Sequence, residues 1–577
     1  MLNAVRNITL VNTWRTLVLV VVLMCCNCAN AQLFINGVPA FSDSKSNIIL
    51  FPVEKERFGQ DFTAVVQADT ASGWRNITVN GKQLTNNPIT FEAVSGDKAY
   101  LVRAFKNNKP IVKRLMFTYL PIMQLKGDFG YNFIDASATL ITPEGAVDRD
   151  MGAKIKWRGG FTNGPGRHKR NYSIKFVDEN GEKQNRKLLG MRRDNHWKLD
   201  AAQVDMSRVR NRVATDLWLD MAHEPYYYND APDVLTGVRG EMLELFVNND
   251  YMGIYTLMEC LDRKQLQVKK YDEVEDKFRG VFWYTNEWST VTAFKKTSTY
   301  NNNLQLFDHF VIEYPEFEEV CPTNHKIIHD AVSFVVNGVV SNFNQNAHLY
   351  FDMPVIIDYA IFNQVLNAID NEVNNIYWIA YDGDVDKKLT LAVWDLDWSA
   401  GMNRNSEDFR GGRAAYDYDY EFSSKLFNRL QNKECIYNRM MVERYWELRK
   451  TWLSTESITK RYADAIDRLI DCGAASRDSA RWSGDSDING LTLDLAAEKL
   501  YITDWLKNRL AYLDRTLMRR SCDINADGAI NAADISALNS YILKGTSPFG
   551  DRNYDVNGDG SVNAADVTYL NKFILGY

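Results

Sequence analysis

The chain has 577 residues, of which 45% are apolar and 24% are charged, and its formal net charge is −7. This acidic balance disfavours a nucleic-acid partner, because phosphate binding requires an excess of lysine and arginine. The length and the apolar content allow two or three domains, each able to bury its own core.

The first 31 residues have the layout of a secretory signal. Two arginines precede an apolar run over residues 17–24, and Ala29 and Ala31 form a typical cleavage site before Gln32. The apolar run is too short to span a bilayer, and no later segment has the roughly 18 uninterrupted apolar residues that a span requires. We therefore expect residues 1–31 to be a signal peptide and the protein to be secreted, without a membrane span.

Removal of the signal leaves five scattered cysteines: Cys260, Cys321, Cys435, Cys472 and Cys522. Their spacing fits neither a disulfide scaffold nor a zinc site. We expect at most one or two disulfide bonds, with one thiol left over.

Residues 32–120 read as short strands with alternating apolar and polar side chains. Asn80-Gly81 and Asn107-Asn108 are typical of tight turns between such strands. This pattern predicts a small β-sandwich of immunoglobulin type. No catalytic constellation occurs in it, so we expect a spacer or an accessory module.

Residues 121–519 change to a mixed α+β pattern. The segment 241–258 predicts a hairpin, and helical spacing of apolar residues predicts helices over 205–221, 355–369 and 495–517. In the second of these helices the apolar residues form one stripe. The last helix closes the domain directly before the C-terminal segment.

Polar side chains in this domain could hold Mg²⁺. Asp395 and Asp397 follow an apolar run and should alternate on one face of a strand, about 6.5–7 Å apart. Asp370 should end a helix, with Asn375 close behind it. Phosphoryl transfer needs such oxygens for a metal ion, together with cations on the phosphates. The alternative is that these residues only cap a strand and a helix.

Seven segments of the middle domain, taken in order, resemble the spore coat protein H (CotH) family of atypical secreted or spore-associated protein kinases. They are residues 154–160, 168–176, 188–199, 205–211, 244–263, 367–375 and 394–401. The resemblance implies a kinase-like domain in which Asp395 and Asp370 are catalytic. Asp395 would bind Mg²⁺, Asp397 and Asn375 would add metal contacts, and Asp370 would face the acceptor or a second metal ion.

A basic segment is the candidate for ATP binding. Arg158, followed by two glycines, could form a turn over the phosphates, and Lys169 or Lys175 could neutralise them. Glu259 could orient the lysine, as the Lys–Glu pair of kinases does. A solvated basic hairpin and a strand-end glutamate facing water are the alternatives.

The C-terminal segment, residues 520–577, contains two copies of a calcium-binding loop, at 523–534 and 555–566. Oxygen side chains occupy loop positions 1, 3, 5, 9 and 12, position 7 offers its main-chain carbonyl, and glycine stands at position 6. The expected ligands are Asp523, Asn525, Asp527, Ala529 and Asp534 in the first loop, and Asp555, Asn557, Asp559, Ser561 and Asp566 in the second. Two Asx-rich turns without metal are the alternative.

Position 12 is aspartate, and each loop is followed by one apolar helix pattern without an incoming helix. This duplicated loop-plus-helix resembles the dockerin family. The resemblance implies a small helical module that folds on two Ca²⁺ ions and binds a cohesin domain of a scaffold or cell-surface protein.

These features together indicate a multidomain protein: a β-sandwich, a kinase-like α+β domain and a dockerin. We expect a secreted, cohesin-docked kinase that transfers phosphate from Mg-ATP to Ser/Thr of proteins in an extracellular, cellulosome-type assembly. The alternative is a non-catalytic structural or adhesion component of a polysaccharide-degrading complex. A third possibility is that the middle domain acts on carbohydrate, although no paired-carboxylate signature can be recognised.

Overall fold

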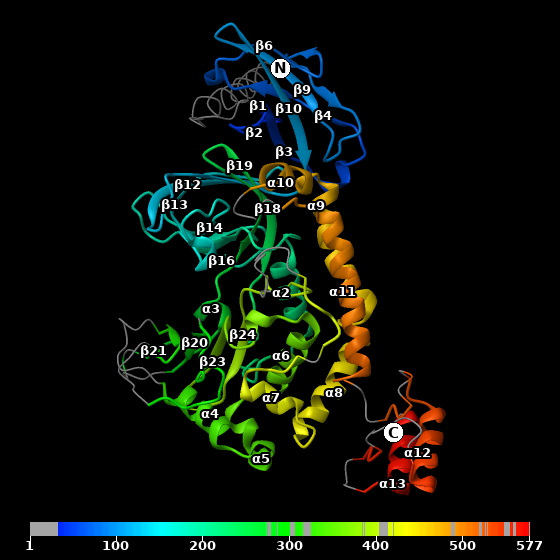
Figure 1. Cartoon of the computed structure of the whole chain (residues 1–577). Coiled ribbons are helices and arrows are strands. Elements are labelled where there is room, and N and C mark those ends of the chain that lie inside the picture. The colour runs from blue at the N-terminus through cyan, green and yellow to red at the C-terminus, as the bar shows by residue number, and fades with distance from the viewer. Residues whose placement is uncertain are drawn as a thin grey trace, which may run out of the picture.

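The computed structural model arranges the chain as three parts in a row: a β-rich N-terminal part, a central α+β part and a small helical C-terminal part (Figure 1). It describes residues 33–272, 274, 279–285, 287–299, 306–315, 325–383, 385, 387–402, 413–418, 420–485, 491–518, 522–525, 527, 529–546, 554–557 and 561–575. The predicted signal peptide, Cys321 and Asp559 lie outside these residues.

The N-terminal part is built on one large sheet with the strand order β5-β1-β2-β3-β10-β9-β6-β7, and β4 pairs separately with β8. The strands are β1 (Leu33–Ile35), β2 (Val38–Ser42), β3 (Ile48–Pro52), β4 (Phe62–Ala64), β5 (Val66–Ala68), β6 (Arg75–Val79), β7 (Lys82–Gln83), β8 (Ile89–Phe91), β9 (Tyr100–Lys106) and β10 (Lys109–Thr118). The predicted turns at Asn80-Gly81 and Asn107-Asn108 are confirmed, since they join β6 to β7 and β9 to β10 in antiparallel pairs.

This sheet packs directly on the central part. One apolar cluster joins the two parts: Phe41, Leu50, Met116, Ile122, Ile141, Phe246 and Tyr251. Close by, Arg477 Nη1 donates a hydrogen bond of 3.0 Å to the carbonyl oxygen of Gly96. A Cβ at Gly96 would lie 2.2 Å from the carbonyl carbon of Cys472, so only glycine permits this approach. The N-terminal part is therefore held against its neighbour by specific contacts.

The first half of the central part is a closed barrel with the strand order β11-β12-β13-β14-β17-β19-β18. Its strands are β11 (Ile122–Lys126), β12 (Ile134–Ile141), β13 (Val147–Arg158), β14 (Asn171–Phe176), β17 (His196–Asp200), β18 (Gly240–Val247) and β19 (Asp250–Met258). The predicted hairpin over 241–258 is confirmed as β18–β19. A short ribbon of β15 (Arg186–Lys187) and β16 (Arg193–Asp194) lies outside the barrel sheet.

The second half combines a sheet, β21-β22-β20-β23-β24, with helices. Its strands are β20 (Val281–Thr285), β21 (Leu306–Phe307), β22 (Phe310–Tyr314), β23 (Ile376–Ala380) and β24 (Thr390–Val393). The helices of the central part are α2 (Arg210–Met221), α3 (Arg263–Leu266), α4 (Lys326–Asn337), α5 (Val340–Tyr350), α6 (Met353–Leu366), α7 (Lys425–Gln431), α8 (Ile436–Leu448), α9 (Thr455–Asp471), α10 (Ala474–Trp482) and α11 (Leu495–Arg515).

The predicted helices exist, but their limits and one packing pattern differ. The helix expected from residue 205 begins at Arg210, because the Asp205 carboxylate accepts from the N–H groups of Ser207 and Arg210 and forms a tight turn. The helix expected over 355–369 is α6, which ends at Leu366 because the next residue, Asn367, has a φ of 52°. Almost every side chain of α6 is buried, so the predicted single stripe is wrong. This helix is enclosed between β24 and the helices α2, α7, α8 and α11.

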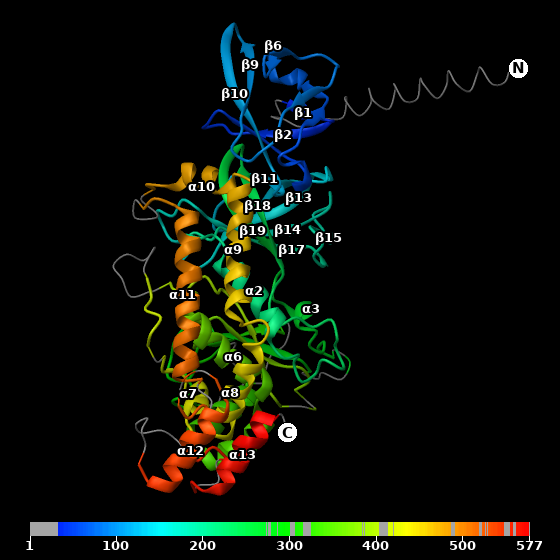
Figure 2. The same cartoon turned by 90° about the vertical axis from the view of Figure 1, so that its right-hand side faces the viewer.

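Helices α9 and α11 pack against each other and run alongside both halves of the central part (Figure 2). Arg468 of α9 forms an ion pair with Glu241 of the barrel strand β18. On α11, Arg509 Nε donates to the carbonyl oxygen of Gln364 in α6, at 2.9 Å. The two helices therefore tie the barrel to the helical half.

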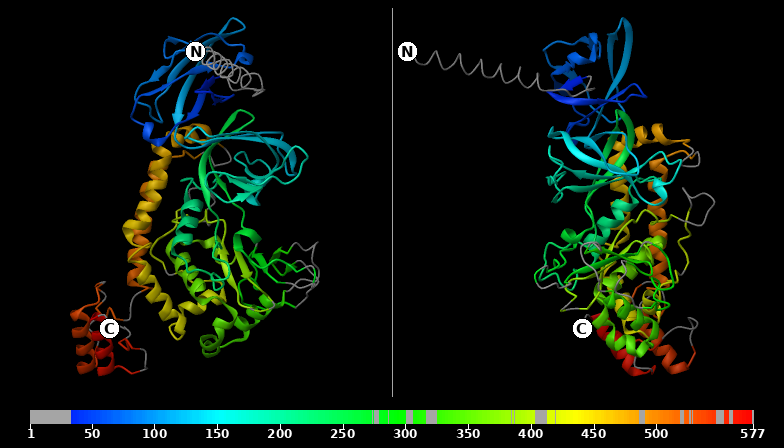
Figure 3. Two further views of the ribbon diagram at one scale, coloured as in Figure 1. Left: turned by 180° about the vertical axis from the view of Figure 1, so that it is seen from behind. Right: turned by 90° about the vertical axis from the view of Figure 1, so that its left-hand side faces the viewer.

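The C-terminal part contains α12 (Ala532–Lys544) and α13 (Ala564–Leu575) and lies at the opposite end of the molecule from the N-terminal sheet (Figure 3). Its small core contains Leu538 and Leu570, and Tyr541 stacks on Tyr554 with ring centroids 3.7 Å apart. Arg439 of α8 contacts the ring of Tyr569.

Two further expectations concern the whole chain. None of the helices in the described residues combines the length and the apolar character needed to cross a membrane. Within the described residues, Cys260, Cys435 and Cys472 are buried free thiols, and Cys522 is also buried.

Candidate functional site

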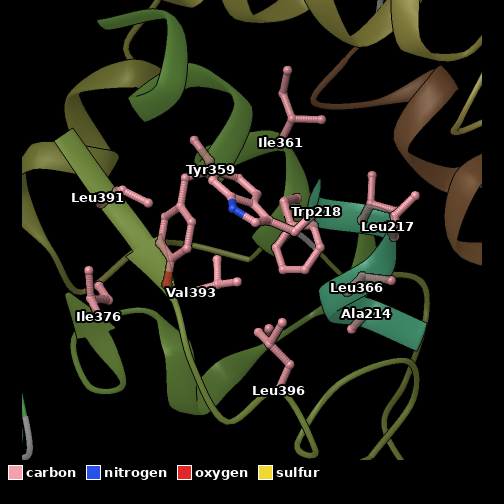
Figure 4. Close-up of a cluster of buried hydrophobic side chains, with 14 of the residues drawn as sticks. Ala214, Leu217, Trp218, Tyr359, Ile361, Leu366, Ile376, Leu391, Val393 and Leu396 are labelled. Atoms are coloured by element: carbon pink, nitrogen blue, oxygen red, sulfur yellow. The ribbon is translucent and has the colours of Figure 1, made fainter. Parts of the chain in front are cut away.

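The loop after β24 carries Asp395 and Asp397. The strand ends at Val393, so the prediction that both aspartates continue it is wrong. Leu396 between them is fully buried in the main core, beside Val393 and Trp218 (Figure 4). Asp395 reaches solvent and Asp397 is half-buried. Asp395 also has a φ of 56°, a left-handed conformation that costs a non-glycine residue energy and is typical of functional sites.

A short turn beside this loop carries Asp370. Helix α6 ends before it, so Asp370 belongs to the turn Ile369–Asn371 and not to a helix end. Asn371 Nδ2 donates to the carbonyl oxygen of Trp394 at 2.6 Å, which ties the turn to the aspartate loop. Asn375 Nδ2 donates to Asp370 Oδ2 at 3.0 Å. The Tyr284 hydroxyl donates in turn to Asn375 Oδ1 at 2.7 Å, so the amide is fixed in orientation.

The barrel contributes cations to the same place. Arg158 lies at the end of β13 and Lys198 on β17, and both are placed over the Trp394 ring, at 5.5 and 4.5 Å from its centroid. Both residues alternate with buried core residues along their strands, so they lie on the outer face of the barrel. Asp200 follows on that face, where it accepts from Asn211 Nδ2 at 2.8 Å.

The carboxylates influence one another. Partial removal of water raises the pKa of Asp395 to about 6, with a further contribution from Asp200 and an opposing one from Arg158. Burial, followed by the charge of Asp395, raises the pKa of Asp397 well above its ordinary value. Burial and then Arg158 lower the pKa of Lys198 to about 8. The site is therefore a cluster of repelling carboxylates faced by two cations.

This cluster fits a magnesium ion of the kind that nucleotide enzymes use. No donor in the described part of the chain makes a hydrogen bond to the carboxylates of Asp395 and Asp397, so their oxygens are available. Among the described residues no three His, Cys, Asp or Glu side chains are grouped closely enough to hold a metal by themselves. Mg²⁺ commonly takes only one or two carboxylates and completes its shell with water and phosphate. Asp395 and Asp397 would hold it, with Asp370 and Asn375 beside them.

The structure places the other predicted nucleotide residues in different surroundings. Lys175 lies on β14, on the same outer face as Lys198, with its ammonium 4.8 Å from the centroid of the Phe133 ring. Lys169 is 1% exposed and donates to the carbonyl oxygens of Ala201 and Ile254, both at 2.6 Å. Of the predicted basic segment, Arg158 therefore lies near the carboxylates of Asp395 and Asp397. Lys169 instead donates to main-chain carbonyl groups in the interior of the protein.

Glu259 is also an interior residue. It is 1% exposed, accepts from the N–H of Arg192 at 2.7 Å and pairs with Arg239 at 2.7 Å. The structure therefore does not bring it together with Lys169 or Lys175.

Sequence reasoning gave no role to Lys198, Asp200, Asn211 or Trp394. The first two could have been found from the alternation of polar and apolar residues over His196–Asp200, which predicts a strand with one polar face. The indole of Trp394 and the amide of Asn211 carry no such signal, because their roles arise only when distant segments meet.

His196, on the same face, offers a test of this environment. Burial and then Lys198 lower its pKa to about 3, so the folded protein leaves it neutral while the unfolded chain protonates near pH 6.5. Stability is therefore lost as the pH falls below about 6.5. The variant His196→Gln keeps an acceptor for the Ser173 hydroxyl. Between pH 7 and pH 5, we expect its free energy of unfolding to fall by about 1–2 kcal/mol less than that of the wild type. Urea unfolding at both pH values measures this, and equal losses in the two proteins would contradict it.

The described residues of the two C-terminal loops share one hydrogen-bond pattern. Asp534 is fully buried and accepts from the N–H groups of Asn525 at 3.1 Å and Asn531 at 2.8 Å. Asp566 is equally buried and accepts from Asn557 at 3.2 Å and Asn563 at 2.8 Å. Each loop is thus curled around its position-12 carboxylate, and the oxygen-rich donor set suits Ca²⁺. The remaining expected ligands within the described residues, Asp523, Asn525, Asp527, Ala529, Asp555, Asn557 and Ser561, lie in these two loops.

Comparison with known protein families decides the assignment. The family described as CotH kinase protein matches residues 155–513, which is more than half of the chain. The chain belongs to the CotH kinase protein family. The matched region, here called the CotH domain, contains Arg158, Lys198, Asp370, Asp395 and Asp397. A second family, the dockerin type I domain, matches residues 521–575 and includes both calcium loops. No curated protein matches the chain significantly.

Proposed function

We propose that this protein is a secreted protein kinase that uses Mg-ATP and is carried into an extracellular assembly by its dockerin. The observation that supports the kinase activity best is the meeting of Asp395 and Asp397 with Arg158 and Lys198 between the barrel and the helical half. Opposite charges arranged in this way suit a metal-bound triphosphate.

Each group has a chemical task in this proposal. Arg158 and Lys198 would bind the phosphate oxygens, and Trp394 holds both cations in place. When bound to Asp395 and Asp397, Mg²⁺ would neutralise charge on the phosphates. Asp370, oriented by Asn375, would accept the proton of the acceptor hydroxyl. The hydroxyl oxygen forms the new bond to the terminal phosphorus, and the bond to the bridging oxygen breaks, leaving ADP.

The dockerin determines the location in this proposal. With two Ca²⁺ ions bound, it would attach to a cohesin domain of a scaffold or cell-surface protein, and the Ser/Thr residues of neighbouring components would be the acceptors. The secretory layout of the first 31 residues supports an extracellular site of action.

Asp395→Asn is expected to reduce phosphate transfer at least about a hundredfold, because it removes a charged metal ligand without changing side-chain volume. The measurement uses the full chain with Mg²⁺, labelled ATP and a generic Ser/Thr acceptor protein. Asp233→Asn, at an exposed position outside the cluster, is the matched control and should keep full activity.

Two outcomes would contradict the kinase proposal. Undiminished transfer by Asp395→Asn would exclude the assigned site. Absence of both transfer and a nucleotide-induced rise in melting temperature in the wild type would favour the alternative, a non-catalytic structural component of a polysaccharide-degrading complex.

A further inference from the structure

The N-terminal sheet carries a concentration of positive charge that the chain as a whole does not share. Strands β6, β7, β9 and β10 contain seven lysines and arginines and neither aspartate nor glutamate, whereas the formal net charge of the chain is −7. The strand register divides these cations between the two sides: Lys82, Lys106, Lys109 and Lys113 lie on the side of the core residues Val79 and Val102, and the three arginines lie on the opposite, outer side. The outer side of these strands therefore carries positive charge only, whereas a balanced surface would intersperse both signs.

Most of these cations have no partner within the described residues. Lys113 donates to the carbonyl oxygens of Asp43 and Ser46. The other six are exposed, and no hydrogen bond or ion pair to a described residue satisfies their side chains: Arg75, Lys82, Arg103, Lys106, Lys109 and Arg114. Like charges that are close together on one face of a sheet destabilise it, so the three arginines of the outer face cost the fold stability unless an anionic partner compensates.

The strand register places three arginines along a diagonal of the outer face. Arg75 is opposite Phe105, Arg103 is opposite Val112, and Arg114 is opposite Leu101. Arg103 and Arg114, which belong to a regular ladder, lie about 7–8 Å apart at the backbone, and an irregularity in β6 follows Arg75. The side chains between them are apolar and exposed, at 37% for Leu101, 45% for Phe105 and 47% for Val112. The face thus combines a row of guanidinium groups with exposed apolar side chains between them.

The outer face of β10 is continuous with the interface between the N-terminal sheet and the barrel. Met116 follows Arg114 on the same side of β10 and is buried against the barrel, together with Leu50 of β3. Beyond Arg114 the face is uncovered up to the turn at Asn107-Asn108, at the end of the molecule remote from the dockerin (Figure 1). A long polymer could therefore lie across it while the C-terminal module is bound elsewhere.

We propose that this outer face of β6, β9 and β10, the arginine face, binds an acidic polysaccharide through its uronate carboxylates. Guanidinium groups bind carboxylates with two parallel hydrogen bonds, which a row of lysines would not do as well. The apolar side chains between the arginines suit the C–H faces of sugar rings, and the diagonal row of arginines suits an extended chain with repeated carboxylates. The inference is independent of kinase activity, because no residue of the CotH domain takes part.

An anionic membrane fits the same charge less well. A hairpin that enters a bilayer presents large apolar side chains at its tip. Here the tip over residues 106–109 reads Lys-Asn-Asn-Lys and is entirely polar. The arginine face therefore favours a polymer that lies along the sheet.

The test is a binding titration of the full chain with polygalacturonate at low ionic strength. The arginine variant combines Arg75→Gln, Arg103→Gln and Arg114→Gln. The control removes the same charge from three exposed lysines of the helical half, by Lys433→Gln, Lys450→Gln and Lys507→Gln. We expect the arginine variant to lose at least tenfold in affinity, the control to stay within twofold, and fully methyl-esterified polymer to bind at least tenfold more weakly. The melting temperature verifies that both variants are folded.

Several results would overturn the proposal. Equal binding of the arginine variant and the wild type would show that the three arginines do not bind the polymer. Equal binding of the esterified and the free polymer would show that the carboxylate is not the recognised group. Binding to phosphatidylglycerol vesicles without binding to polygalacturonate would replace the polysaccharide by a membrane surface.

Discussion

Removal of calcium is expected to unfold the dockerin while the CotH domain stays folded. The core of this module is small and contains few fully buried side chains, among them Ile524, Leu538 and Leu570. Modules of this size usually need a metal or another cross-link for stability. A ligand at a thousand times its dissociation constant stabilises the folded state by about 4 kcal/mol per site. Two occupied loops would therefore account for most of the stability of the module.

Calorimetry of the full chain with calcium, and again with a chelator, measures this effect. We expect a separate transition to disappear on chelation and amide exchange to become fast across residues 522–575. Asp534→Ala should act like partial chelation, since it removes the carboxylate around which the first loop is curled. Ser536→Ala, which loses only a bond to the Ala532 carbonyl, is the control. A module indifferent to the chelator would contradict the assignment of the loops.

Asp478→Ala is expected to destabilise the CotH domain by about 3–5 kcal/mol, because it leaves two buried cations without their counter-charge. Asp478 is fully buried, pairs with Arg208 at 2.9 Å and lies 3.7 Å from Lys169. It also accepts from the N–H of Ile254 at 3.0 Å. Burial alone would raise the pKa of Asp478, but Arg208 and Lys169 lower it below its ordinary value. Its contribution to stability is therefore present above about pH 4 and is lost as the pH falls further.

Urea unfolding monitored by tryptophan fluorescence measures the loss, with Asp233→Ala as an exposed control. A second variant, Asp478→Asn, keeps the volume and tests the charge alone. A loss below about 1 kcal/mol in both variants would show that Arg208 and Lys169 find other partners, contrary to the contacts described.

Local signals in the sequence were sufficient for several elements of the fold. Asn-Gly and Asn-Asn turns identified their hairpins, because they depend only on neighbouring residues. The closed barrel was not predictable, since closure depends on the parallel pairing of β11 with β18, more than a hundred residues apart. The start of α2 differs from the prediction because Asp205 accepts from the N–H groups of Ser207 and Arg210 and holds the residues before the helix in a turn.

At the site, sequence reasoning found the acidic residues and only part of the basic ones. Asp370, Asn375, Asp395 and Asp397 stood out as polar residues after apolar runs, and the structure brings them together. Lys169 and Lys198 could not be ranked in advance, because burial depends on what packs over each strand. Lys169 bonds to two interior carbonyl groups, whereas Lys198 faces Trp394.

The helices α9 and α11 brace the junction between the barrel and the helical half, where the candidate site lies. Arg468 of α9 is fixed to the barrel and Arg509 of α11 to the helical half, so hinge opening would have to break one of these attachments or the packing between the two helices. A nucleotide would consequently enter a frame of constant width, and turnover would not be gated by large swings of one half against the other. If the proposed activity is correct, the exchange of nucleotide and product would depend on diffusion and on side-chain rearrangement.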